Sequence, residues 1–86
     1  MKYTVLWTKT ALKKLKKLKN KNIERIIEKV EEVSDDPIKF FKKLTNMPLY
    51  SLRIGKYRVI ATIDTEKHSI IILTIEHRKR AYKTLK

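Results

Sequence analysis

The spacing of the hydrophobic positions changes twice along the chain, from alternation to helical periodicity and back to alternation. Residues 2–7 alternate and predict a first strand. Apolar residues then recur at helical spacing over residues 11–18, with lysines at the intervening positions. We expect this helix to be capped by Thr8 or Thr10, because a hydroxyl there can accept a hydrogen bond from a free N–H of the first turn.

A second helix is predicted over residues 22–33, where isoleucine and valine recur at i, i+3, i+4 and i+7. Asn22 is its expected N-cap, and the sequence "SDDP" at 34–37 ends it. The short connection at 19–22 predicts an antiparallel helical hairpin. Residues 38–48 show no clear period and are expected to form a loop or an irregular helix.

Alternation returns after Pro48 and predicts a β-hairpin, in which residues 50–54 and 57–63 pair across a turn at Gly55 and Lys56. Residues 69–75 are apolar at nearly every position, as expected of a central strand that is covered on both faces. The chain of 86 residues is long enough for one small domain, 1–86.

The predicted fold is therefore a single α+β domain with the order β-α-α-β-β-β. A two-helix hairpin packs on one face of a largely antiparallel, curled sheet, and the other face stays partly open. A short C-terminal tail follows the last strand.

Composition excludes several classes of protein. The chain has no cysteine, and its two histidines, His68 and His77, lack the spacing of a metal-binding pair, so neither a metal site nor a cofactor is expected. No apolar stretch reaches the length of a membrane span or a signal sequence. The sequence thus predicts a soluble, cytoplasmic protein that does not bind a membrane.

Charge points to a polyanionic partner. Lys and Arg total 22 against 9 acidic residues, for a net charge of +13. The charge is uneven, since residues 1–21 hold eight lysines and no acid, whereas residues 22–36 hold six acids. A potential of this size attracts nucleic acid first and an acidic protein second. Four of the five arginines lie in the last 34 residues, which indicates a local site, because the guanidinium binds phosphate bidentately.

These arginines are expected to converge. Alternation places Arg53 and Arg58 on the face opposite the apolar residues, within one or two cross-strand positions of each other. Such like charges cost stability, which an anion would relieve. Arg78 and Tyr82 leave the end of the last strand close by, and Lys56 lies at the rim. The sequence predicts a concave anion-binding surface on the open face of the sheet.

Such a surface could cleave RNA without a metal. The reaction removes the 2′-OH proton, stabilises the charge of the pentacoordinate phosphate and protonates the leaving 5′-oxygen. Arginine suits only the second task, because it hardly loses its proton. Tyr82 and Lys56 are better proton carriers, and Tyr82 could instead stack on a base.

Plainer interpretations stand beside these. The two hairpin arginines could be solvated or paired with Asp64 and Glu66, as is ordinary on a half-exposed sheet. His77 could be structural and Tyr82 a plug of the core. The lysine-rich first helix could be a solvated face or a nonspecific electrostatic surface.

The hairpin "GKYRVIATID" and the final "IEHRKRAYK" resemble the RelE/ParE superfamily of toxin–antitoxin toxins, specifically the RelE branch. The family's Tyr-Arg pair is present as Tyr57 and Arg58. Members end a strand with Gly-His-Arg-x-x-x-Tyr, and here Glu76 replaces the glycine. The remaining positions match as His77, Arg78 and Tyr82.

The resemblance implies a type II toxin that acts as a metal-independent endoribonuclease and cuts mRNA in the ribosomal A site. Its partners would be the ribosome, the A-site mRNA and an acidic, RelB-like antitoxin that wraps the toxin. Two alternatives remain open: a ParE-like toxin that inhibits gyrase without nuclease activity, and a basic RNA-binding module without enzymatic activity.

The resemblance also implies roles for individual residues. Arg58 corresponds to the arginine that stabilises the transition-state phosphate, Arg78 to its partner near the leaving group, and Tyr82 to the tyrosine that contacts the reacting nucleotide. Arg53 stands where members carry a lysine, and it completes the expected catalytic set.

The general base is the main departure from the family. Ser51 occupies the position of a further lysine that is often assigned as the base, so its identity stays open, with Lys56 as a possible substitute. Ser51, Lys56 and Arg80 are expected to contact the substrate.

Overall fold

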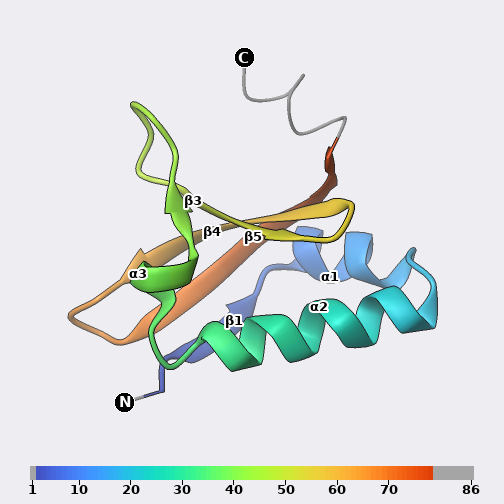
Figure 1. Cartoon of the computed structure of the whole chain (residues 1–86), viewed down its shortest axis with the longest axis horizontal. Coiled ribbons are helices and arrows are strands. Elements are labelled where there is room, and N and C mark those ends of the chain that lie inside the picture. Colours follow the sequence, from blue (N-terminus) through green and yellow to red (C-terminus); the bar gives the residue numbers. More distant parts are fainter. Residues whose placement is uncertain (1, 79–86) are drawn as a thin grey trace.

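The computed structural model describes residues 2–78, and within this range three helices and five strands form one α+β domain (Figure 1). The elements are β1 (Thr4–Trp7), α1 (Lys9–Lys16), α2 (Asn20–Val33), α3 (Pro37–Phe40), β2 (Lys42–Lys43), β3 (Tyr50–Ile54), β4 (Tyr57–Asp64) and β5 (Ser69–His77). The predicted order of the main elements is confirmed. The segment 38–48, which carries no period, supplies α3 and the short strand β2. The expected C-terminal tail lies outside the described residues.

The five strands form one mixed sheet in the order β1-β5-β4-β3-β2. β1 is parallel to β5, and the other three pairings are antiparallel, as the largely antiparallel prediction requires. The first and last strands of the chain are therefore neighbours, and β1 and β2 form the two edges.

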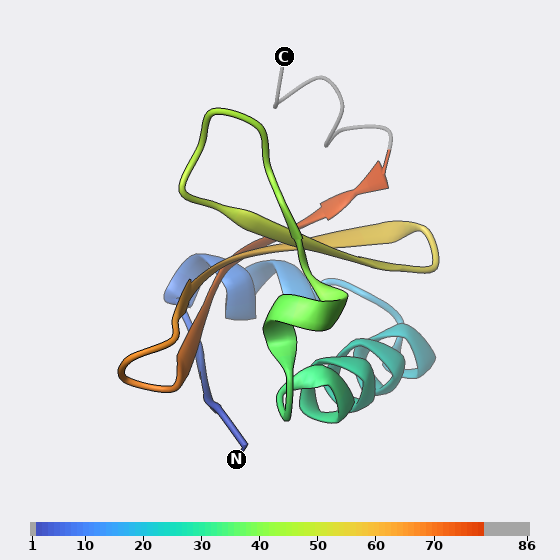
Figure 2. The ribbon, with the colours of Figure 1, turned by 60° about the vertical axis from the view of Figure 1, so that its left-hand side comes forward.

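The core lies between the sheet and the two longer helices, which cover the same face (Figure 2). Both helices present an apolar stripe, which packs against alternate residues of β3, β4 and β5. The most deeply buried of these side chains are Ala11, Ile26, Val30, Val33, Val59, Ala61, Ile70 and Ile72. Removing this apolar surface from water is the main force that holds helices and sheet together.

Thr8, rather than Thr10, caps α1. Its side-chain oxygen accepts a hydrogen bond from the Ala11 N–H at 3.1 Å, and the same hydroxyl donates to the Leu73 carbonyl at 2.9 Å. One side chain thus satisfies the first turn of the helix and joins it to β5.

The expectation that Asn22 caps α2 is wrong. The helix begins two residues earlier, at Asn20, and its N-cap residue Lys19 makes no side-chain capping bond. The Asn22 N–H already donates to the Lys19 carbonyl at 2.9 Å, so Asn22 belongs to the first helical turn. Asn20 and Asn22 are equally polar, so residue type alone does not show at which of them the helix begins.

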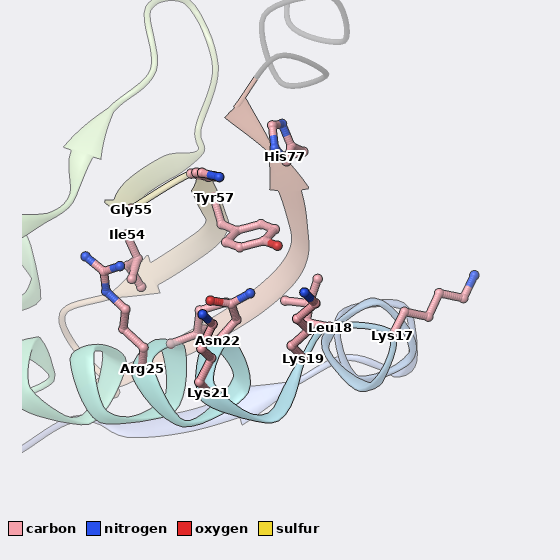
Figure 3. A pocket seen from close by; sticks show the side chains of 12 residues that line it. Lys17, Leu18, Lys19, Lys21, Asn22, Arg25, Ile54, Gly55, Tyr57 and His77 are labelled. Atoms are coloured by element: carbon pink, nitrogen blue, oxygen red, sulfur yellow. The ribbon is translucent and has the colours of Figure 1, made fainter.

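The two helices cross steeply rather than lying antiparallel. Figure 3 looks along the axis of α1 while α2 runs across the view, and Figure 2 shows the converse. The two-helix unit on one face is present, and its short connection at residues 17–19 leads α2 away from α1 toward the β3–β4 turn.

The face of the sheet opposite the helices is only partly covered. Ile70, Ile72 and Ile75 of β5 are buried against the helices, but Ile71 is 36% exposed on the other face, beside its partner Leu6 at 50%. The expected cover on both faces of β5 is therefore wrong at Ile71.

A β-bulge divides β5. Ile60 pairs with Thr74, whereas Ala61 pairs with Ile72, so Leu73 has no partner residue on β4. The extra residue changes the alternation, which is why Ile72 and Ile75, three positions apart, face the same side.

Gly55 closes the β3–β4 hairpin in a conformation that favours glycine. Its φ is +58°, as a two-residue turn with glycine first requires. A Cβ atom built on Gly55 would lie 2.9 Å from Nη1 of Arg25, so the guanidinium rests against the turn. The glycine thus serves the turn and lets α2 approach it.

Gly55→Ala is expected to lower the free energy of unfolding by about 1–2 kcal/mol, because an L-residue with positive φ brings its Cβ close to the next carbonyl. Urea unfolding of the variant and the wild type measures this loss. The Arg25 side chain can swing away, so the same loss is expected in an Arg25→Ala background. A loss that disappears in that background would show that the clash, and not the turn, controls the site.

Candidate functional site

Arg53 and Arg58 face each other directly across the hairpin. They are Cα partners in the β3–β4 ladder, which confirms the predicted proximity. Arg53 is exposed and Arg58 is half-buried. Their partners in alternation, Leu52 and Val59, are buried in the core, so the two arginines lie on the open face.

Glu76 continues this row onto β5, where it is the Cα partner of Arg58. Its carboxylate accepts hydrogen bonds from the Lys14 ammonium and from the Thr74 hydroxyl, the latter at 3.2 Å, and its side chain is 18% exposed. The sequence alone marked Glu76 only as a substitution of the family glycine. Thr74 and Glu76 are two residues apart on one strand, so alternation in the sequence indicated that they share one face.

A second row on the same face brings Ser51 next to Lys42. These two residues are Cα partners between β2 and β3, and opposite residues of an antiparallel pair project from the same side. Ser51 is only 8% exposed, and its other neighbour is the buried Ile60. Lys42 is exposed. The structure thus places Lys42 opposite Ser51, the residue that stands where the family carries a lysine. Lys42 belongs to β2, a strand that the sequence did not predict.

Arg78 directly follows β5 and stays beside the hairpin turn. Its N–H donates to the Lys56 carbonyl at 2.7 Å, which extends the β4–β5 pairing by one hydrogen bond. The backbones of Arg53, Arg58 and Arg78 therefore gather at one end of the sheet. Arg80 and Tyr82 lie outside the described residues.

Two other residues of the sequence motif lie on the helix side. Tyr57 and His77 are Cα partners, and their rings meet edge to face with centroids 5.7 Å apart. Lys56, expected at the rim of the arginine surface, lines a hollow on this helix side together with both rings.

The alternative pairing of the hairpin arginines with Asp64 and Glu66 is wrong. Asp64 ends β4 six residues beyond Arg58, about 20 Å along an extended strand, which exceeds the reach of an arginine side chain. Its Oδ1 instead accepts bonds from the N–H groups of Glu66 and Lys67, both at 3.0 Å, and shapes the β4–β5 turn.

The open face is therefore suited to bind a phosphodiester. Guanidinium groups from two strands and from the end of a third can share the charge of one phosphate, and a hydroxyl and an ammonium lie in the next row. Within residues 2–78 no three histidine, cysteine, aspartate or glutamate side chains are grouped to hold a metal ion. In the same range, no helix is long and apolar enough to span a membrane.

Residues 5–82 match the family described as ParE toxin of type II toxin–antitoxin system, parDE. The chain belongs to the RelE/ParE family of type II toxin–antitoxin toxins.

Individual relatives lie in the RelE branch. The chain is 33% identical over 86 residues to "Toxin RelG" of Mycobacterium tuberculosis, covering 96% of this chain and 99% of the relative. It is 38% identical over 88 residues to "Putative toxin RelE1" of Methanocaldococcus jannaschii, covering 96% and 98%. A chain in the crystal structure of the toxin–antitoxin complex RelBE2 from M. tuberculosis superimposes with a TM-score of 0.84 at 32% identity, covering 91% of this chain and 93% of that one. The predicted resemblance is confirmed.

The facing arginines should repel each other in the free protein. A double-mutant cycle of Arg53→Gln and Arg58→Gln, measured by urea unfolding, is expected to give a repulsive coupling of roughly 0.2–1 kcal/mol at low ionic strength. Salt near 1 M should reduce this coupling, because the Debye length falls to about 3 Å. The cycle cancels contributions from other neighbours, such as Glu28, which lines a shallow hollow with Arg53. An attractive coupling would contradict the arrangement of the pair.

Proposed function

We propose that this toxin is a ribosome-dependent, metal-independent endoribonuclease that cleaves mRNA in the A site and so inhibits translation. The observation that carries the proposal is the direct pairing of Arg53 with Arg58, with Arg78 held beside the same turn. Guanidinium groups from two facing strands, with a third beside the same turn, can bind one phosphate together.

The chemistry needs these charges, an acceptor for the 2′-hydroxyl proton and a proton donor to the leaving 5′-oxygen. The 2′-oxygen attacks the adjacent phosphorus, the bond from phosphorus to the 5′-oxygen breaks, and the products carry a 2′,3′-cyclic phosphate and a 5′-hydroxyl. Arg58 stabilises the extra negative charge of the pentacoordinate phosphate, and Arg78 acts near the leaving oxygen. Arg53 holds the phosphate in place, and Tyr82 contacts the reacting nucleotide. Lys56 and Arg80 bind flanking phosphates.

The proton of the 2′-hydroxyl needs an acceptor, and Lys42 supplies an amine for it on the open face. It lies opposite Ser51 and therefore projects from the face of the arginines. Ser51 is mostly buried and contributes a hydroxyl to the floor.

The partners follow from the charge and from the relatives. The net charge of +13 favours the RNA-rich surface of a ribosome, and it favours an acidic antitoxin that neutralises the toxin between periods of activity. The similar chain from M. tuberculosis was crystallised as a toxin–antitoxin complex. We place the protein in the cytoplasm, where ribosomes and antitoxin are present.

A ParE-like action is the second candidate, because the matching family carries the ParE name. In that case the same basic surface would bind and inhibit gyrase without cutting RNA. A third candidate is an RNA-binding module that lacks enzymatic activity.

One experiment separates the three. The purified protein is incubated with programmed ribosomes, mRNA ends are mapped, and gyrase supercoiling is assayed in parallel. We expect cuts at the A-site codon, and a loss of rate of about 100- to 1,000-fold in Arg58→Ala and in Arg78→Ala, because each removes a charge that stabilises the transition state. Inhibition of supercoiling without cuts supports the ParE-like action, and RNA binding without either activity supports the third candidate.

The role of Lys42 has a matched control in the next residue. Lys43 is the partner of Tyr50 and projects from the opposite side of β2, although both lysines are exposed. Lys42→Gln is expected to lower the single-turnover cleavage rate by about 100-fold or more, as the loss of a general base does. Lys43→Gln carries the same charge change and should stay within a few-fold of wild type. Equal effects of the two substitutions would reject Lys42 as the base.

A further inference from the structure

A hollow of about 700 Å³ lies on the helix side of the sheet, between the β3–β4 turn and the connection from α1 to α2 (Figure 3). Its volume is within the range of sites that enclose small organic ligands, about 300–1,000 Å³. It belongs to the face opposite the arginine row, and of its lining residues the proposed cleavage uses only Lys56.

Among residues 2–78, five cationic side chains from three segments and no carboxylate line the hollow. The cations are Lys17, Lys19, Lys21, Arg25 and Lys56. All five residues are exposed, and the three ion pairs formed among residues 2–78 involve none of them. Lysines brought together without a counter-charge repel one another, so an anion bound here relieves that repulsion.

Aromatic rings stand beside these cations. Figure 3 shows the Tyr57 ring extending from the hairpin into the hollow, with His77 above it and Lys19 and Lys21 on the helix side. Tyr57 is half-buried, and its ring packs edge to face with His77. A flat ring next to several ammonium groups suits a ligand that combines a planar base with phosphates. A carboxylate-rich peptide would use the cations but not the ring.

The position of the hollow connects it with the arginine row. Tyr57 and Arg58 are consecutive residues of β4, so one lies on the helix side and the other on the open face. Both sites reach the hairpin turn at Gly55 and Lys56. A flexible single strand can therefore pass around this end of the sheet and contact both faces.

We infer that the hollow is a nucleotide-binding subsite for single-stranded RNA, in which Tyr57 stacks on a base while Lys19, Lys21 and Arg25 hold its phosphates. The strand that occupies it continues around the hairpin turn to the arginine row. The inference rests on the proposed function in taking RNA as the ligand.

The first test measures how many phosphates the hollow neutralises. A short, fluorescein-labelled 2′-O-methyl oligoribonucleotide, which lacks the attacking hydroxyl, is titrated with the full-length protein by fluorescence anisotropy over a range of salt concentrations. Lys19→Gln/Lys21→Gln is compared with Lys39→Gln/Lys67→Gln, a pair of exposed lysines outside the hollow that carries the same charge change. We expect the slope of log affinity against log salt to fall by about 0.7 for each phosphate that the first variant no longer neutralises. The control pair should leave the slope nearly unchanged.

The second test measures stacking. Tyr57→Leu is expected to weaken binding about tenfold or more at every salt concentration, because a stacked base loses its ring partner. Tyr57→Phe keeps the ring and should bind like wild type, which separates loss of the ring from loss of the hydroxyl.

Equal slopes for the two lysine pairs would overturn the inference. So would an acidic peptide that binds the hollow and loses affinity in Lys19→Gln/Lys21→Gln while RNA does not. The RNA used here cannot be cleaved, and no ribosome is present. The binding results therefore do not depend on the outcome of the cleavage assay, and the cleavage assay does not depend on the binding results.

Discussion

Burial of a single face of the sheet is the constraint on which the rest of the structure depends. The helices cover the side that carries Val59, Ala61, Ile70 and Ile72, and that apolar set can be buried only in one register of the strands. The same register sends the intervening residues to the other side. The facing arginines are therefore a consequence of how the core packs. Their positions on the sheet cannot shift unless the strand register of the core shifts as well.

Much of this arrangement could be predicted because it follows from local periodicity. The alternation in residues 50–63 and the glycine turn together determine which residues pair, so the proximity of Arg53 and Arg58 was accessible from the sequence. A threonine cap at Thr8 or Thr10 and the order of the main elements could be predicted for the same reason, and the structure selects Thr8. These features depend on neighbours within a few positions along the chain.

The features that could not be predicted depend on distant or very short segments. β2 has two residues, too few to show a period, so the lysine opposite Ser51 had no sequence signal. The contact between Lys14 and Glu76 joins residues 62 positions apart, and nothing in either segment indicates the other. The crossing of the helices was also missed, because a short connection limits distance but does not determine angle.

The bulge at Leu73 has a consequence for how this chain can vary. It determines which face of the sheet every later residue of β5 occupies. If every residue of β5, Leu73 included, paired in a regular ladder, Ile75 would lie opposite Arg58 and Glu76 would turn toward the apolar core. The hydroxyl of Thr8 binds the carbonyl of this same residue. The N-cap of α1 is thus joined to β5 at the bulge. Before the bulge β5 contributes Ile70 and Ile72 to the core, and after it Glu76 lies beside Arg58.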